Sequence, residues 1–479
     1  MLFRSNAYLQ SRPQGAIDIG QRGLDVIVPV VGAPEASLGA KLEFGRTQMN
    51  LGFALLRDRQ FPASLVSLEQ ARAVFRALGD DPAARQRASV FFGETTAWLA
   101  ETLRFTGRGS EVPAVVDEAM RIVDEAVQRE AGNLGALRSR ALLGSRITQV
   151  ALDAFDYAKA ETQGRRVADD YTEFLRFDPD NDSARGNRRV VQNLVAQALW
   201  RQGRLDETIA LTKAGVREAI EHGGSPSSLT GAAFAVARVD NLEAALGRVT
   251  DFEAALADGD RLRAKASAQT DTESFFRALL PLWNEGTRAD MKLASGQTAA
   301  ALNAARAMEG KLAAMKPLSG LEKLSYRGSM QANQRLQTVA CLALRQWADA
   351  ARTGRALLVG RPDADDTSVS AFDELAADRA LVAVALARNG EREESRKLRD
   401  EATAYFTKLL AAGADDHETR FQSATLALVW GLLSDAAAEK RTAFSAGLAE
   451  IAAMPAQPRQ LRWVRELKAT LEEELAQVK

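Results

Sequence analysis

The chain has 479 residues and is almost electrically neutral, with 62 Lys and Arg against 63 Asp and Glu. This balance argues against a basic nucleic-acid-binding stripe, a polybasic membrane anchor and an acidic tail. The single cysteine, Cys341, excludes an internal disulfide framework and a metal site made of several thiolates. Its apolar neighbours indicate a buried structural thiol. Hydrophobic residues make up 46% of the chain, enough for a long core.

No stretch approaches the roughly 18 apolar residues that a transmembrane helix needs. The most apolar short run, Leu24–Val31, contains Asp25 and Pro29 and is expected to end a buried helix. The N-terminus lacks the charged region, apolar run and cleavage site of a signal peptide. We therefore expect a cytoplasmic protein without membrane insertion. A periplasmic location stays open if the chain is a piece of an anchored protein.

The first 24 residues are predicted to hold the end of one helix, a turn and a second helix that carries the small residue Ala16. The first helix would then begin at or before Met1 and leave an uncapped apolar edge, made of Leu2, Phe3, Tyr8 and Leu9. Solenoids normally need polar capping at their ends. Two interpretations stay open: a fragment of a longer chain, or a short natural first helix. An uncapped end also allows self-association.

Residues 190–220 predict two amphipathic helices joined by a turn at Gly203. Apolar residues recur with the period of a helix on both sides of this turn, and Ala210 and Gly215 leave room for a neighbouring helix. Five further segments fit the same template: 50–71, 154–179, 285–308, 334–362 and 379–402. Two stretches, 82–133 and 229–270, continue the helical pattern but match the template poorly, and we expect divergent helix pairs there.

The pattern resembles the tetratricopeptide repeat, a helix–turn–helix unit with small residues at fixed positions. The resemblance implies an all-α, right-handed α-solenoid. The turns at Gly296, next to Trp347 and at Gly390 are spaced more widely than the ~34 residues of the standard repeat, so helices or linkers must be longer. Such long-helix arrays resemble the docking or sensory arms of large bacterial signalling proteins, which stand beside a kinase or DNA-binding domain. The sequence shows no such effector domain.

The domain organisation follows from the loops. The flexible composition of the segment around residues 223–228 predicts a linker between N-terminal repeats, residues 1–222, and C-terminal repeats, residues 229–479. Residues 458–479 are expected to form a capping helix with a narrow apolar stripe: Val464, Leu467, Leu471, Leu475 and Val478.

A search for catalytic patterns finds no P-loop, dinucleotide-binding fingerprint or nucleophile elbow. The two histidines are His222, at the edge of the linker, and His417, which follows Asp415 and Asp416. These three adjacent residues could contribute to a metal site, but N-capping of a helix explains the aspartates better. We expect no catalytic residue, no cofactor and no metal.

In tetratricopeptide arrays the first helix of each pair lines a groove. The matching positions predict seven partner-binding residues: Asn50, Phe53, Arg57, Asn193, Gln197, Trp200 and Arg201. The amide and guanidinium groups suit a peptide backbone or a terminal carboxylate. The alternative is an ordinary polar helix face, and Trp200 is a binding anchor only if it is exposed.

The leading hypothesis is a protein-interaction scaffold that binds a protein or peptide partner, in a bacterial signalling or assembly system. An all-α enzyme would need a pocket with two or more buried carboxylates of shifted pKa. An RNA-binding solenoid would need a regular basic or aromatic series. The two histidines and the lack of a catalytic motif argue against the enzyme, and the near-neutral charge and the lack of such a series argue against the RNA reader. Both stay as alternatives.

Overall fold

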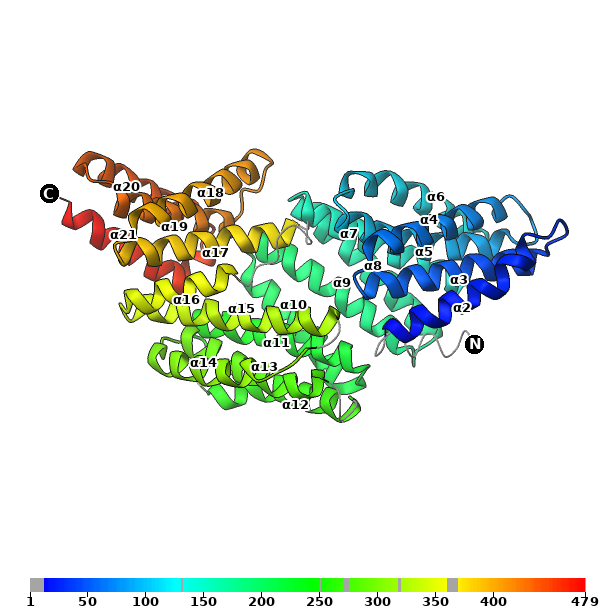
Figure 1. Cartoon of the computed structure of the whole chain (residues 1–479), viewed down its shortest axis with the longest axis horizontal. Coiled ribbons are helices and arrows are strands. Elements are labelled where there is room, and N and C mark those ends of the chain that lie inside the picture. Colours follow the sequence, from blue (N-terminus) through cyan, green and yellow to red (C-terminus); the bar gives the residue numbers. More distant parts are fainter. Residues whose placement is uncertain are drawn as a thin grey trace. The chain divides into compact units, whose positions relative to one another are not determined.

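We describe the protein from a computed structural model that places residues 13–130, 132–249, 251–270, 275–317, 320–359 and 369–478. Helices, turns and short loops account for all of these residues (Figure 1). None of the helices in these ranges has both the length and the apolarity that a membrane span requires.

Contacts between residues divide the structure into two compact units. Described residues up to Val195 form the first unit, and described residues from Ala196 onward form the second. The chain passes from one unit to the other within helix α9 (Asp182–Arg201). The expected linker, residues 223–228, lies within the second unit, so its role as a boundary stays a prediction.

The first unit contains antiparallel helix pairs. Its elements before α9 are α2 (Pro13–Val31), α3 (Leu38–Arg57), α4 (Phe61–Leu78), α5 (Arg85–Phe105), η1 (Gly109–Glu111), α6 (Val112–Arg129), α7 (Leu134–Asp153) and α8 (Tyr157–Phe177). We call the odd-numbered helices from α3 to α19 the A helices, and the even-numbered helices from α4 to α20 the B helices. Neighbouring A helices pack on one another, as α5 does on α7, and an A helix packs between two B helices, as α5 does between α4 and α6.

The second unit continues the same alternation from the end of α9. Its elements are α10 (Leu205–His222), α11 (Pro226–Ala245), α12 (Phe252–Gln269), α13 (Phe275–Ala294), α14 (Thr298–Ala313), α15 (Gly320–Ala343), α16 (Trp347–Val359), α17 (Val369–Arg388), α18 (Arg392–Ala411), α19 (His417–Leu433), α20 (Ala437–Ala453), η2 (Pro458–Gln460) and α21 (Arg462–Gln477). The two stretches expected to be divergent pairs are indeed helix pairs, α5 with α6 and α11 with α12.

One turn joins the A helix to the B helix in eight successive repeats. A residue with positive φ follows the A helix in each: Arg59, Gly107, Phe155, Gly203, Gly247, Gly296, Arg345 and Gly390. The N–H of the next residue donates to the carbonyl five positions earlier, over 2.7–2.9 Å, as from Arg204 to Leu199. This left-handed helix ending satisfies carbonyls that the helix would otherwise leave unpaired. These positions recur every 44 to 49 residues.

The A helices are 17–24 residues long, which confirms that the repeats are longer than the standard unit. The described part of the chain is therefore an all-α solenoid of helix–turn–helix repeats that are longer than the tetratricopeptide unit that they resemble.

Small residues let the helices of a pair approach closely, as the sequence predicted. A Cβ atom on Gly144 in α7 would lie 2.4 Å from Cγ2 of Val167 in α8. On Gly431 in α19 it would lie 2.1 Å from Phe444 of α20. A larger side chain at either position would force the two helices apart, and overpacking of this kind destabilises a core.

The sequence predicts a small helical residue at Ala16, a buried thiol at Cys341 and the end of a buried helix at Leu24–Val31. Ala16 is buried in α2, and Cys341 is fully buried, where burial raises the pKa of its thiol. Leu24–Val31 ends α2, but the expectation that it is buried was wrong for Val26, Val28 and Val30, which are exposed. A helix that packs on one neighbour buries only one stripe, and α2 packs on α3. Leu2, Phe3, Tyr8 and Leu9 lie outside the described residues.

The recurrent turn predicts opposite effects of two Gly-to-Ala substitutions. No atom lies within 4 Å of a Cβ added to Gly390 or to Gly328, so neither change causes a clash. Gly390 has φ of 85°, and Gly390→Ala should lower the free energy of unfolding by about 1 kcal/mol because a Cβ disfavours the left-handed region. Gly328 lies inside α15, where alanine is the better helix former. Gly328→Ala should therefore raise the free energy of unfolding by about 0.5–1 kcal/mol. Urea denaturation of both variants measures the difference. Equal shifts of the same sign would contradict the role of the turn.

Candidate functional site

Three consecutive A helices of the first unit bring an aromatic pair and a guanidinium together. The rings of Phe53 in α3 and Trp98 in α5 lie 4.3 Å apart between centroids. The guanidinium carbon of Arg146 in α7 lies 5.5 Å from the centroid of the Trp98 ring. We call Phe53, Trp98 and Arg146 the aromatic row. All three side chains are partly exposed, so the row belongs both to the core and to the surface.

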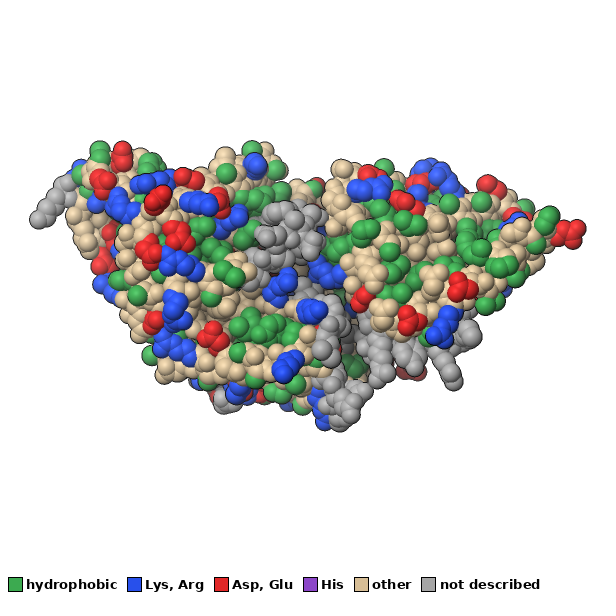
Figure 2. Space-filling view, viewed as in Figure 1, with side chains coloured by type: hydrophobic (Ala, Val, Ile, Leu, Met, Phe, Trp, Pro, Cys, Tyr) green, Lys and Arg blue, Asp and Glu red, His purple; other side chains and the backbone are tan. Residues whose placement is uncertain are grey.

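Two ion pairs flank the aromatic row. Nη2 of Arg146 lies 2.6 Å from Oε2 of Glu101, and Nη1 of Arg138 lies 3.5 Å from Oε1 of Glu94. These pairs hold the long side chains beside Trp98 and leave little net charge there. On the face visible in Figure 2, Lys and Arg side chains are interspersed with Asp and Glu.

The structure places the three predicted binding residues of α3 around this row. Phe53 is part of it, and Asn50 and Arg57 lie about one helical turn to either side. Asn50 is partly exposed and Arg57 is exposed. Neither side chain makes a hydrogen bond or ion pair with a residue that the structure describes, so both are available to a partner.

The four predicted residues on α9 have different surroundings. Asn193 is partly exposed and Gln197 is exposed, without polar partners among the described residues. In the second unit, the indole Nε1 of Trp200 donates to Oε1 of Glu418 over 2.7 Å. Nη1 of Arg201 lies 2.9 Å from Oε2 of Glu418. The structure therefore connects Trp200 and Arg201 with α19 in the second unit. Asn50, Phe53 and Arg57 belong to the first unit.

These contacts close the second unit on itself, because α19 is five repeats after α9. His417 packs edge-on against Trp200, with 4.6 Å between ring centroids. We call Trp200, Arg201, His417 and Glu418 the latch. Asp416 precedes α19 as its N-cap and accepts from the N–H groups of Glu418 and Thr419, both over 3.0 Å. This confirms capping as the role of Asp416. No group of three metal-ligating side chains occurs among the described residues.

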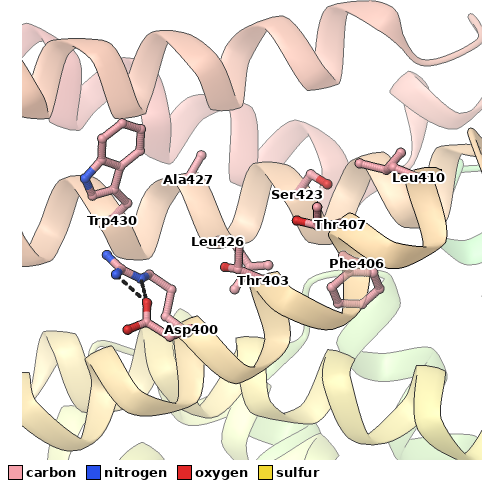
Figure 3. Close-up of a pocket in the computed structure, with 10 residues that line it drawn as sticks. Asp400, Thr403, Phe406, Thr407, Leu410, Ser423, Leu426, Ala427 and Trp430 are labelled. Carbon is pink, nitrogen blue, oxygen red and sulfur yellow. Dashed lines mark hydrogen bonds and ion pairs between the residues drawn. The ribbon is translucent and has the colours of Figure 1, made fainter.

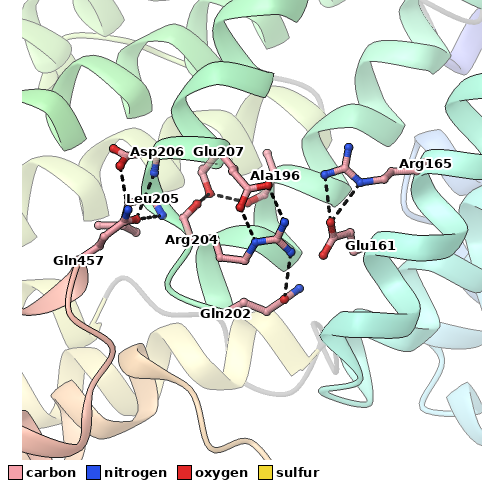
Figure 4. A network of polar contacts seen from close by, with 10 residues as sticks. Glu161, Arg165, Ala196, Gln202, Arg204, Leu205, Asp206, Glu207 and Gln457 are labelled. Atoms are coloured by element: carbon pink, nitrogen blue, oxygen red, sulfur yellow. Dashed lines mark hydrogen bonds and ion pairs between the residues drawn. The ribbon is translucent and has the colours of Figure 1, made fainter.

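Gln457 adds a second closing contact close by (Figure 4). Its Oε1 accepts from the backbone N–H groups of Leu205, over 2.7 Å, and Asp206, over 3.3 Å. Its Nε2 donates to Oδ2 of Asp206 over 2.8 Å. The first N–H groups of a helix have no partner within that helix. A side chain from the far end of the second unit thus caps α10, whose own N-cap residue Arg204 makes no side-chain cap bond.

Helix α21 then crosses three A-to-B turns of the same unit. The Arg462 guanidinium lies against Gly296, after α13. Oε1 of Glu473 lies 3.6 Å from Nη2 of Arg345, which follows α15. Oε1 of Glu474 lies 2.6 Å from Nη1 of Arg388, at the end of α17. From the predicted apolar stripe, Val464, Leu467 and Leu471 are buried and Leu475 and Val478 are partly buried. Helix α21 therefore covers the edge of its own unit that is formed by the turns after α13, α15 and α17, which we call the turn edge.

Charged groups of the second unit occur in separate places and do not form one catalytic cluster. Nε of Arg335 in α15 donates to Oδ1 of Asp378 in α17 over 2.7 Å. Partial desolvation raises the pKa of Asp290 in α13, although this residue is exposed, and the nearby charge of Arg335 opposes the shift. Burial also raises the pKa of Asp240 to about 7, helped by Glu243. The charges that act on Asp240 come from α10, α11 and α12, so these two carboxyl groups do not share a site.

A shallow groove of about 310 Å³ lies between α18 and α19 (Figure 3). Its apolar lining includes Phe406, Leu410 and Trp430. Its two charged lining residues, Arg399 and Asp400, form an ion pair in which Nε and Oδ1 lie 2.9 Å apart. The groove therefore holds no unpaired ionisable group for catalysis.

Trp98, Arg146 and the closing contacts were not found from the sequence. Trp98 lies in the stretch 82–133, which matches the repeat template poorly, so its inner-face position was not recognised. The spacing of the turns contains the missing signal, because Gly107 lies midway between Arg59 and Phe155. A search for a period of about 48 residues would have aligned α5 with its neighbours.

No family model matches the chain, and no curated protein matches it. Similar solved structures include the TPR domain of P58(IPK), with 12% identity, 90% of this chain and 98% of that chain covered, and a TM-score of 0.20. The APC/C hetero-tetramer Cut9–Hcn1 has 12% identity, 98% and 95% coverage and a TM-score of 0.26. Naa15/Naa10 bound to HypK-THB has 10% identity, 98% and 93% coverage and a TM-score of 0.22. These values are too low to transfer a function, and the repeat assignment rests on the recurrent turn of this chain.

The raised pKa of Asp240 predicts a pH-dependent effect of Asp240→Asn. The folded state holds its proton up to about pH 7, whereas an unfolded Asp releases it near pH 4. Asp240 therefore costs no stability in acid but lowers the free energy of unfolding as the pH rises from about 4 to 7. Between pH 5 and pH 8, the free energy of unfolding of Asp240→Asn should rise by on the order of 2 kcal/mol relative to that of the parent protein. Urea denaturation at both pH values measures this. The exposed Asp180→Asn is the control, and a gain that is independent of pH would contradict the assignment.

Proposed function

We propose that the protein is a protein-interaction scaffold and that the first unit binds a peptide or helical segment of a partner on the inner face of its A helices. The observation that carries the proposal is the aromatic row, in which side chains from α3, α5 and α7 form one partly exposed surface. Large aromatic side chains and Arg are the residues that most often dominate binding energy at protein interfaces.

The polar surroundings of the row suit a peptide. The side chains of Asn50 and Arg57 supply donors about one helical turn to either side of Phe53. An extended or helical peptide presents carbonyl oxygens along its length. The flanking carboxylates already have Arg partners, so the surface has little excess charge of either sign. We therefore expect a partner that inserts apolar side chains and makes a few directed hydrogen bonds, with a weak dependence of affinity on salt.

The two units then have different roles in the proposal. In the first unit the row and its free neighbours stay accessible. In the second unit the chain's own α19 and Gln457 contact the end of α9 and the start of α10. Asn193, partly exposed on the part of α9 that belongs to the first unit, belongs to the proposal as a secondary contact. Gln197 is exposed on the same helix in the second unit and stays a predicted binding residue. A role in a bacterial signalling or assembly system, as a cytoplasmic arm beside an effector domain, rests on the sequence resemblance and is part of the same proposal.

Loss of the aromatic row should abolish peptide binding. A displayed library of random peptides is selected on the full chain, and enriched peptides are titrated against purified variants. Trp98→Ala and Phe53→Ala should each weaken binding at least tenfold, because truncation of a central aromatic anchor commonly costs 2 kcal/mol or more. Val66→Ala, which changes an exposed apolar side chain of B helix α4, is the matched control and should bind as the parent does.

Thermal unfolding of each variant establishes that the first unit stays folded. Peptides that bind Trp98→Ala and Phe53→Ala as tightly as the parent would refute the proposed surface. Failure of any peptide to enrich on the parent would argue against a peptide-binding role for the first unit.

A further inference from the structure

The contact between α9 and α19 encloses a histidine that has one unused nitrogen. His417 is 3% exposed. Its Nδ1 lies 3.4 Å from the backbone carbonyl oxygen of Arg201, and its Nε2 is buried without a partner. A carbonyl oxygen only accepts, so the neutral ring donates from Nδ1 and leaves a bare lone pair on Nε2. The buried lone pair is tolerable in the neutral ring, but protonation would place an N–H there with no acceptor.

Charged groups surround the ring on both helices. Arg201 of α9 opposes a positive charge on His417, whereas Asp416 and Glu418 of α19 favour it. Both carboxylates are already engaged, Asp416 as the N-cap of α19 and Glu418 with Trp200 and Arg201. Arg238 of α11 adds a further positive charge within range of Glu418. Burial outweighs the carboxylates, and the pKa of His417 is lowered from its ordinary value.

We propose that His417 is a proton-sensitive element of the latch, and that its protonation releases α19 and the segment around Gln457 from α9 and α10. Release removes the hydrogen bond from Trp200 to Glu418, the ion pair of Arg201 and the cap that Gln457 places on α10. It would free the turn edge that α19, η2 and α21 cover. The closed form is then the form at neutral pH, and the open form gains population in acid.

The sign and the size of the effect follow from the lowered pKa. The closed latch binds a proton less readily than a solvated histidine, whose pKa is about 6.5. Closure therefore has its full stability above pH 6.5 and loses stability as the pH falls through and below that value. Between pH 7.5 and pH 5.5 the equilibrium constant for opening should rise by up to about tenfold, as far as the closed form stays unprotonated.

Hydrogen exchange of the full chain tests the proposal. Mass spectrometry follows amide protection at pH 7.5 and pH 5.5 in α19 and in residues 455–461, corrected for the intrinsic effect of pH. In the parent, protection there should fall by up to about tenfold at pH 5.5. Helix α5 of the first unit is the internal reference, since both histidines of the chain, His222 and His417, lie in the second unit.

Two variants that cannot titrate isolate the histidine. His417→Phe keeps an aromatic ring against Trp200, and His417→Gln keeps a neutral polar side chain. Both should lose the pH response. His222→Phe, at the only other histidine and an exposed one, should keep it. If one substitution unfolds the unit, the other still decides the outcome. Unchanged protection in the parent, or the same loss in the variants, would overturn the proposal.

Discussion

The left-handed turn that follows the A helices from α3 to α17 is the constraint on which the rest of the structure depends. It ends the helix, pairs its last carbonyls and reverses the chain within a few residues, so that A and B helices pack antiparallel. Because the turn recurs at nearly constant spacing, successive A helices come to lie side by side, and residues one repeat apart meet in space. The aromatic row is a direct product of this register, since Phe53, Trp98 and Arg146 come from consecutive A helices. Arg59, Phe155 and Arg345 adopt the same conformation without glycine, at a local cost that the packing of the helices offsets.

The same repeat produces two different surfaces in the two units. In the first unit the aromatic row lies beside two ion pairs, Arg146 with Glu101 and Arg138 with Glu94. In the second unit the solenoid meets its own beginning: α19 contacts the end of α9, Gln457 caps α10, and α21 crosses the turns after α13, α15 and α17. A solenoid normally uses its ends and faces for partners. In the second unit, α19 and Gln457 of the chain itself occupy the end of α9 and the start of α10. A partner could reach this region only after those contacts are broken.

The sequence predicted the local structure well, because that structure depends on local signals. Helical periodicity, small residues and the glycines at positions 203, 296 and 390 identify helix pairs without any knowledge of distant contacts. The seven predicted binding residues could be chosen for the same reason, by position within a repeat. What they touch could not be predicted. Trp200 is hydrogen-bonded to Glu418, more than two hundred residues later in the chain, and Gln457 to Leu205 across a similar separation in sequence. Such contacts depend on how small rotations between repeats accumulate over five pairs, and no single stretch of sequence encodes that sum.

Arg57 and Arg201 show how this accumulated geometry decides what a given repeat position contacts. Each lies two residues before the turn residue of its repeat, at the C-terminal end of an A helix. Arg57 is exposed and has no polar partner among the described residues, whereas Arg201 pairs with Glu418 and lies beside His417. An identical residue at an identical repeat position is therefore available to a partner in one unit and part of a closing contact in the other. The difference lies in the element that reaches it, α19, whose first turn carries both the carboxylate that holds Arg201 and the histidine that responds to protons. The proposed binding in the first unit and the closing contact in the second thus involve the same position of the repeat, two residues before the turn residue. What packs against that position differs between the two units.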